Sequence, residues 1–275
     1  MATPVPDAYN ADPLREWGRL ERDAYRRLEF ELTWDALTRR LPLGAHVLDA
    51  GGGPGRYALE LCRAGWQVTL ADITSGLLEV ARTNFAAEPP EVQARLCGIE
   101  QVDLRDLSRF AEGTFDATLC LGGPLTHLPV RSDQEQAVRE MARVTRPGGL
   151  IYLTGVGYLA VLRYMLNFHR EELLADYIDS FLEDGNAPGP GGMLWHFFRA
   201  DELRGLAESC ELEILEMVGC QGLSSGLPQV TNEMAENEPE HWAAWRKVLF
   251  RTAQMPAVVD GAEHILWVGR KRRLG

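Results

Sequence analysis

The chain has 275 residues, of which 45% are hydrophobic and 25% charged, the composition of an ordinary globular protein with a sizeable core. Its 28 Lys and Arg against 40 Asp and Glu give a formal net charge of -12, which repels phosphate backbones, so no nucleic-acid partner is expected. The 5 cysteines are odd in number and form no Cys-x-x-Cys pair, which argues against a disulfide framework and a metal site. We find no targeting segment and no apolar run of about 18 residues, so no membrane partner is expected. These features favour a cytoplasmic protein.

A helical region is predicted at the N-terminus. Asp12-Pro13 is a typical helix start, because the Asp side chain can accept a hydrogen bond from a free amide and Pro is tolerated at the first helical position. Apolar residues then keep helical spacing to about Arg40, where a Leu-Pro-Leu-Gly stretch breaks the pattern. We therefore expect residues 1–42 to form an N-terminal helical cap on a domain of residues 43–275.

Short apolar strands alternate with helices from His46 to Thr154. The expected strands are 46–50, 67–71, 99–102, 115–121 and 150–154, and the expected helices are about 56–63, 75–86 and 133–144. Strands separated by helices of this length form parallel βαβ units with helices on both faces of the sheet. Such sheets bind ligands outside the carboxyl ends of their strands, which locates the expected site.

The pattern changes after Thr154. The expected elements are a long helix 158–182, a Gly/Pro hinge 185–192, a helix 200–209, a strand 212–218, a helix 240–253 and a final strand 264–269. The two added strands predict an α/β fold, a Rossmann-like open sheet of about seven mostly parallel strands with helices on both faces. We interpret the intervening segments as insertions at about 156–196 and 219–261, the first of them a helical lid, because this is more economical than a second domain.

The strongest motif lies between the first strand and the first helix of this domain, in the run Val-Leu-Asp-Ala-Gly-Gly-Gly-Pro-Gly-Arg-Tyr-Ala that begins at Val47. Glycines at this place let backbone amides approach a ligand and leave the helix N-terminus open to it. The motif alone is ambiguous, since Gly53, Gly55 and Ala58 also fit a relaxed dinucleotide fingerprint, and Asp72 lies at about the right distance for a ribose contact.

Asp49 favours a different cofactor. A carboxylate at the end of this strand would be repelled by a pyrophosphate, whereas it attracts a cofactor that carries an ammonium and a sulfonium. The pattern of an apolar strand, Asp49, and glycines at Gly51, Gly53 and Gly55 resembles motif I of the class I S-adenosylmethionine-dependent methyltransferases. The resemblance implies that S-adenosyl-L-methionine is the cofactor and that the last strand of the sheet is antiparallel.

The resemblance continues at the expected intervals from about residue 43 to 155. It implies that Asp72 binds both ribose hydroxyls, with Ile73 beside it, and that Asp103 lies next to the adenine amino group. It further implies that Leu104 lines the adenine and that Leu121 lies beside the transferred methyl group. The nearest likeness is to the small-molecule branch typified by the methyltransferases of ubiquinone and menaquinone biosynthesis. Leu-Gly-Gly-Pro follows the fourth strand in place of the Asn/Asp-Pro-Pro-aromatic tetrad of base-methylating enzymes, which again speaks against nucleic acid.

Structural explanations compete with each of these roles. The glycines could form a tight turn without a ligand, although three at alternate positions exceed what a turn needs. Asp49 could accept a helix-cap hydrogen bond, and Asp72 could be the N-cap of the second helix. Asp103 could be a solvated loop carboxylate.

Two histidines are the candidates for acid–base chemistry. His127 follows the fourth strand and is expected to face the methyl donor, and His196 lies just past the Gly/Pro hinge. Either could instead be a hydrogen-bonded core residue. Methyl transfer is an in-line displacement at an already activated sulfonium, so a base is needed only if the acceptor arrives protonated.

The sequence therefore predicts transfer of a methyl group from S-adenosylmethionine to a small-molecule acceptor. Two alternatives stay open at this point. An NAD(P)-dependent oxidoreductase could use the same glycines, but it needs a second nicotinamide-binding half. A non-catalytic ligand-binding protein on a methyltransferase scaffold would carry the same motifs.

Overall fold

The computed structural model describes residues 5–189 and 192–272. Seven strands form one sheet in the order β3-β2-β1-β4-β5-β9-β8. The strands are β1 (His46–Ala50), β2 (Gln67–Asp72), β3 (Leu96–Gln101), β4 (Phe115–Cys120), β5 (Thr145–Val156), β8 (Leu212–Gly219) and β9 (His264–Lys271). The pairings from β3 to β5 are parallel, and β9 is antiparallel to both of its neighbours. The predicted α/β fold class is thus confirmed, including the antiparallel last strand.

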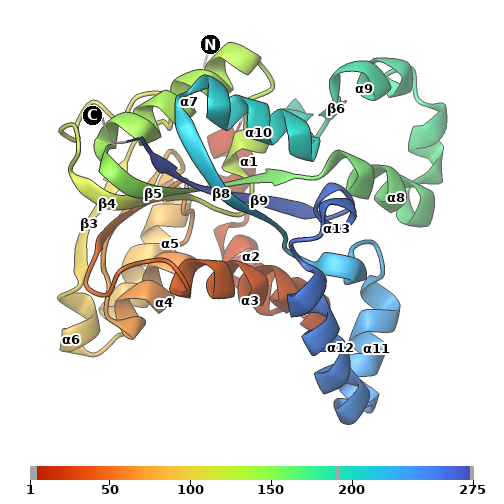
Figure 1. Ribbon diagram of the computed structural model, residues 1–275, viewed down its shortest axis with the longest axis horizontal. Coiled ribbons are helices and arrows are strands. Elements are labelled where there is room, and N and C mark those ends of the chain that lie inside the picture. The colour runs from red at the N-terminus through yellow and green to blue at the C-terminus, as the bar shows by residue number, and fades with distance from the viewer. Residues whose placement is uncertain (1–4, 190–191, 273–275) are drawn as a thin grey trace.

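Helices cover both faces of this sheet (Figure 1). One face carries α3 (Ala24–Thr38), α4 (Arg56–Ala64) and α5 (Ser75–Ala86), and the other carries α7 (Arg131–Val144) and α10 (Ala200–Ser209). Each face has its own hydrophobic core. Because successive strand residues point to opposite faces, Val47 packs into the core under α3, α4 and α5, and Leu48 packs into the core under α7 and α10. Both side chains are fully buried, so β1 lies at the centre of the molecule.

The N-terminal region is divided into α1 (Val5–Asn10), α2 (Pro13–Gly18), the short 3-10 helix η1 (Arg19–Glu21) and α3. The predicted start is confirmed, since Asp12 Oδ1 accepts a hydrogen bond from Arg15 N at 3.2 Å. The prediction of one continuous helix to about Arg40 is wrong. Asp23 caps a new helix by accepting from Arg26 N at 2.8 Å, and the intervening turn directs Arg19 against buried Glu29.

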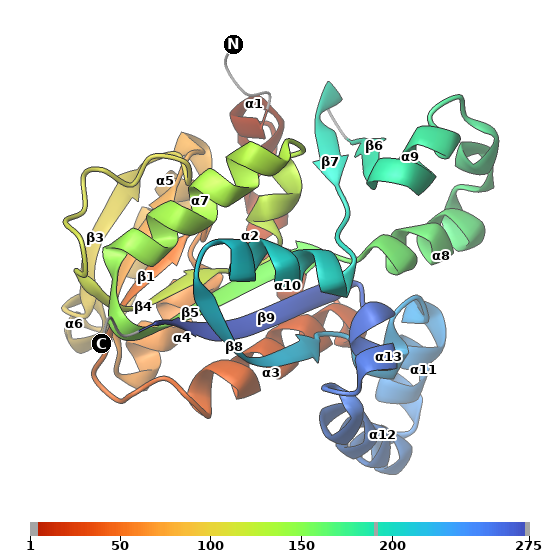
Figure 2. The same cartoon turned by 45° about the horizontal axis from the view of Figure 1, so that its top comes forward.

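The segment after β5 projects from the sheet as an arm of residues 157–189 and 192–198 (Figure 2). It contains α8 (Tyr158–Phe168), η3 (Arg170–Leu174), α9 (Ile178–Asp184), β6 (Asn186–Pro188) and β7 (Leu194–His196). The single helix predicted for 158–182 is therefore wrong, since the chain turns twice. The Gly/Pro stretch 185–192 is also not a simple hinge, because β6 pairs antiparallel with β7; Pro190 and Gly191 lie outside the described residues.

The remaining helices occupy connections between strands. They are α6 (Pro90–Gln93), η2 (Pro124–His127), η5 (Gly222–Ser224), α11 (Pro228–Asn237), α12 (Pro239–Thr252) and α13 (Pro256–Asp260). Of the last three, only α12 was predicted, at residues 240–253. Within the described ranges, no helix is long and apolar enough to cross a membrane.

Candidate active site

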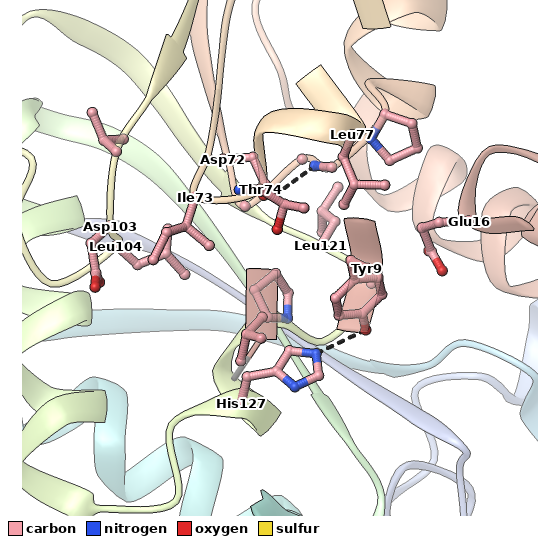
Figure 3. A pocket seen from close by; sticks show the side chains of 18 of the residues that line it. Tyr9, Glu16, Asp72, Ile73, Thr74, Leu77, Asp103, Leu104, Leu121 and His127 are labelled. Carbon is pink, nitrogen blue, oxygen red and sulfur yellow. Dashed lines mark hydrogen bonds between the residues drawn. The ribbon is translucent and has the colours of Figure 1, made fainter. Parts of the chain in front are cut away.

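A cavity lies at the carboxyl ends of the central strands, as the sheet topology predicts (Figure 3). Eight of the predicted site residues line it: Gly51, Gly53, Asp72, Ile73, Asp103, Leu104, Leu121 and His127. They come from four separate loops, each directly after a strand, which the parallel sheet brings together at one edge. Asp49, Gly55 and His196 do not line this cavity.

The glycine loop between β1 and α4 forms one wall. Gly51, Gly53 and Gly55 have φ angles of +73°, +55° and +81°, a region that side chains other than glycine rarely adopt. A Cβ on Gly51 would lie 2.8 Å from Pro124 Cγ, whereas a Cβ on Gly53 would meet nothing closer than Leu77 Cδ1 at 3.6 Å. Gly55 instead packs against the core, since its Cβ would lie 3.1 Å from Leu70. Gly53 is therefore the glycine that keeps the cavity open.

Asp72 ends β2 and joins it to this loop. Its Oδ2 accepts a hydrogen bond from Gly53 N at 2.9 Å, and its Oδ1 accepts from Thr74 N at 2.7 Å. Burial raises the pKa of this carboxyl, while the bonds from Thr74 and Gly53 oppose the rise. Thr74, and not Asp72, occupies the N-cap position of α5. The carboxylate is thus held in place by two amides while it lines the cavity.

Asp49 lies directly behind the loop and is fully buried. A Cβ on Gly52 would lie 2.5 Å from Asp49 Oδ2, and both carboxyl oxygens lack a hydrogen-bond partner among the described residues. Burial, with a further contribution from the charge of Asp72, raises the pKa of Asp49 to about 7. The Ala58 amide lowers this pKa but does not reach hydrogen-bonding geometry, so Asp49 caps no helix here.

Asp103 and Leu104 lie on the loop after β3. Burial opposes ionisation of Asp103, but hydrogen bonds from Arg105 prevail and lower its pKa. Arg105 donates to it from the backbone N at 2.9 Å and from Nη2 at 2.6 Å. The carboxylate is therefore already paired, and Val102 and Leu104 are the apolar residues that this loop offers to the cavity.

His127 stands opposite Asp72, at the end of η2 (Figure 3). Its Nε2 is 3.0 Å from the hydroxyl of Tyr9 in α1, and its Nδ1 has no hydrogen-bond partner in the described part of the chain. Burial lowers the pKa of His127 to about 4, so the ring is neutral at pH 7. Burial also raises the pKa of Tyr9, which keeps the hydroxyl protonated. A neutral imidazole at this edge of the sheet can accept a proton.

His196 lies away from this cavity, on β7. Its Nδ1 is 3.0 Å from Asn186 Oδ1 and its Nε2 is 2.7 Å from Glu202 Oε1. Both ring nitrogens are thus engaged, and the buried ring ties the small hairpin to α10. The structure does not bring His196 together with the other predicted site residues.

Several lining residues were not predicted, above all Tyr9, Glu16 and Arg19 from the N-terminal helices. Arg19 donates to Glu29 at 2.6 and 3.0 Å and to Glu16 at 2.7 Å. Nothing local in the sequence marks Arg19 as a lining residue, because its partner Glu29 lies ten residues further on in a separate helix. The Tyr9–His127 contact joins residues 118 positions apart and has no local signal either.

Comparison with known proteins agrees with this geometry. Residues 47–149 match the model of a methyltransferase domain. A ubiquinone biosynthesis O-methyltransferase of Xanthomonas oryzae pv. oryzae is 36% identical over 121 residues, 44% of this chain and 47% of that protein. One from Xanthomonas campestris pv. campestris is 29% identical over 186 residues, 67% of this chain and 70% of that protein. The chain spans about half the length of the first of these relatives.

The fold is shared with solved methyltransferases as well. The structure of an S-adenosylmethionine-dependent methyltransferase from Methanosarcina mazei superposes with a TM-score of 0.60 at 23% identity, covering 87% of this chain and 98% of that one. The matched residues 47–149 run from β1 into β5 and carry the glycine loop, Asp72 and the loop after β3. Residues 47–149 are therefore similar to a methyltransferase domain, and the chain has the fold of a solved S-adenosylmethionine-dependent methyltransferase.

Proposed function

We propose that the protein transfers a methyl group from S-adenosyl-L-methionine to a small-molecule acceptor. The observation that carries this proposal is the placement of the buried Asp72 carboxylate beside an open glycine loop, at the carboxyl ends of β1 and β2. A cavity lined by both groups suits a molecule with a ribose at one end and a flexible cationic arm at the other. The matched methyltransferase domain supports the same assignment.

The lining residues fit this cofactor in chemical type. Asp72 would accept hydrogen bonds from the ribose hydroxyls, with Ile73 next to it, and Leu104 would pack against the adenine, near Asp103. Gly51 and Gly53 would leave room for the methionine portion, and the unpartnered Asp49 carboxyl behind them would attract its ammonium group. The bound cofactor would supply an activated methyl group beside Leu121.

The remaining work belongs to the chain's own residues. We propose that His127 accepts a proton from the acceptor, because burial keeps its ring neutral, and that Tyr9 orients the ring through Nε2. Residues 1–42 would act as a cap on the domain of residues 43–275, since α1 and α2 line the cavity and exclude water from it. The insertions at about 156–196 and 219–261 would shape the acceptor side.

We also propose a cytoplasmic location and no nucleic-acid partner. The five cysteines are free thiols, four of them buried, as suits a reducing compartment. The net charge of -12 disfavours a phosphate backbone.

Thermal unfolding with added ligands tests the proposed function. S-adenosylhomocysteine at a hundredfold excess over its dissociation constant should stabilise the protein by about 2.7 kcal/mol, and NAD or NADP should not. Asp72→Ala should weaken this binding by roughly 1.5–3 kcal/mol, the usual worth of a charge-assisted contact. Stabilisation by NAD alone would point to an oxidoreductase, and S-adenosylhomocysteine binding without methyl transfer to any acceptor would point to a binding protein.

A further inference from the structure

A second cavity, of about 910 Å³, lies between the arm and the start of α3. Most of its wall is apolar or aromatic, and this part includes Val156, Ala160, Val161, Tyr164, Met165, Phe168, Trp195 and Phe197. Val156 is the last residue of β5, so this cavity opens at the same edge of the sheet as the first one. Its size lies in the range of about 300–1,000 Å³ that is typical of sites for small molecules.

The two cavities share a wall at two points. The His127 ring, which lines the first cavity, packs edge-on against the Trp195 ring of the second, with centroids 5.3 Å apart. A Cβ on Gly123 would lie only 3.0 Å from Val156 Cγ2, so the loop after β4 and the end of β5 are in close contact there. The Trp195 ring therefore stands between a molecule in the second cavity and His127, which lines the first cavity.

The polar groups of the second cavity are unequally satisfied. Its carboxylates already have donors, since the Tyr25 hydroxyl donates to Glu263, and the Tyr177 hydroxyl donates to Glu172 at 2.8 Å. Arg26 Nε is buried and has no hydrogen-bond partner within residues 5–189 and 192–272. Its nearest carboxylate oxygen, Asp23 Oδ2, is 3.8 Å away, beyond hydrogen-bonding distance. Trp195 Nε1 is also buried without a hydrogen-bond partner among the described residues. The unsatisfied groups of this wall are thus two donors, one of them cationic, which call for an anionic or strongly accepting oxygen.

We propose that this second cavity binds the methyl acceptor, and that the acceptor is an extended, largely apolar ring compound with an acidic oxygen that pairs with Arg26. The identification of the ligand as the methyl acceptor rests on the proposed function, but the existence of the binding site does not. The volume and the aromatic wall disfavour small polar acceptors, which would leave most of the cavity unfilled. The site is distinct from the cofactor cavity, so the two ligands should bind together.

A matched pair of fluorescent probes tests this site without knowledge of the acceptor. 8-Anilinonaphthalene-1-sulfonate has the aromatic body and an anionic group, and N-phenyl-1-naphthylamine has the same rings without the charge. Both should bind the wild-type protein. Arg26→Gln should weaken binding of the sulfonate about tenfold, the effect of losing one charge-assisted contact, and should leave the neutral probe within twofold. Arg22→Gln, four residues away on an exposed side chain, is the control and should change neither.

Filling the cavity tests its location. Ala160→Phe places a ring in the wall and should abolish binding of both probes; Val161→Phe serves the same purpose if the first variant does not fold. Thermal stabilisation by S-adenosylhomocysteine, measured on each variant, reports an intact fold and cofactor site. Full probe binding in a folded Ala160→Phe protein, or equal loss of both probes in Arg26→Gln, would overturn the inference.

The same measurements separate this inference from the proposed function. If S-adenosylhomocysteine binds but the probes ignore all three cavity variants, the second site is refuted and the methyltransferase assignment stands. If the probes respond as expected but S-adenosylhomocysteine does not bind, the assignment fails and the second site stands. Displacement of the sulfonate by S-adenosylhomocysteine would also contradict two separate sites.

Discussion

At the scale of single residues, the most unusual group is the carboxyl of Asp49. Burial raises its pKa to about 7, so the native state binds a proton that the unfolded chain, with a pKa near 3.9, releases. Because the folded pKa is the higher one, the free energy of unfolding falls as pH rises from about 4 to about 7. Above pH 7 the buried charge costs on the order of 4 kcal/mol in the absence of a cation.

Asp49→Asn should therefore stabilise the ligand-free protein at pH 8 and do so less at pH 5, where Asp49 is largely protonated. The same substitution should weaken binding of S-adenosylhomocysteine at pH 8, because its ammonium group loses the carboxylate. Thermal unfolding at the two pH values, with and without the ligand, measures both effects. If Asp49→Asn makes the ligand-free protein less stable at pH 8, Asp49 holds the loop in place and does not serve as a counter-ion for the cofactor.

His127 is the residue that we expect to touch the acceptor. Its pKa of about 4 leaves the ring unprotonated throughout the neutral range, so its lone pair is always free to assist loss of a proton from a phenol, thiol or ammonium, although the same low pKa makes it a weaker base than an ordinary histidine. His127→Gln should lower kcat by roughly 10²–10⁴-fold while the affinity for S-adenosylhomocysteine is nearly constant. Turnover should not fall between pH 8 and 6, as it would for a histidine of ordinary pKa near 6.5.

The competing role for His127 is structural, through its bond to Tyr9. Tyr9→Phe is the matched variant, because it removes that bond and keeps both rings. A loss of less than about threefold in His127→Gln, equal to that in Tyr9→Phe, would favour the structural role. Proximity without a base would then be the leading account of catalysis.

At the scale of elements, the glycine loop couples backbone conformation to the cofactor cavity. Gly53→Val should reduce S-adenosylhomocysteine affinity more than tenfold, because φ is +55° and the side chain would enter open cavity space. Gly44→Val is the matched control. Gly44 has φ +73° and nothing within 4 Å of its Cβ, so it carries a similar backbone strain, of the order of 1 kcal/mol, away from the site. Isothermal titration should find the affinity of Gly44→Val for S-adenosylhomocysteine unchanged. An equal loss of affinity in Gly44→Val and Gly53→Val would mean that backbone strain alone weakens binding.

The same elements show what sequence could predict. The glycine loop, Asp72 and the parallel strands were predictable because strand–turn–helix patterns are local and a parallel sheet brings successive strand ends to one edge. The break at residues 18–23 was missed because the apolar spacing continues across it, although Gly18 ends α2 and Asp23 is an N-cap of the same kind as Asp12. Strand β6 was also not predicted, because its Gly/Pro-rich surroundings have a poor strand propensity and only its pairing with β7 makes it a strand.

At the scale of the whole molecule, packing divides the chain into parts of unequal stability. The sheet is buried between two large cores, whereas the arm relies on a small cluster of Tyr158, Met165, Phe181, Ala187 and Phe197. Large apolar side chains of the arm remain exposed, among them Leu166, Phe168 and Leu174. The arm should therefore open locally at a lower free energy than the sheet.

Native-state hydrogen exchange tests this division. Amides of residues 158–188 should exchange through local openings, well before those of β1 and β4, which exchange only on global unfolding. S-adenosylhomocysteine should slow exchange in the glycine loop and in α1, because both line its cavity, and should leave the arm unchanged. Adding 8-anilinonaphthalene-1-sulfonate should then slow exchange in α8, which lines the second cavity. If the amides of the arm exchange as slowly as those of the sheet before any ligand is added, the arm is rigid and does not open locally. That result would contradict a role as a lid.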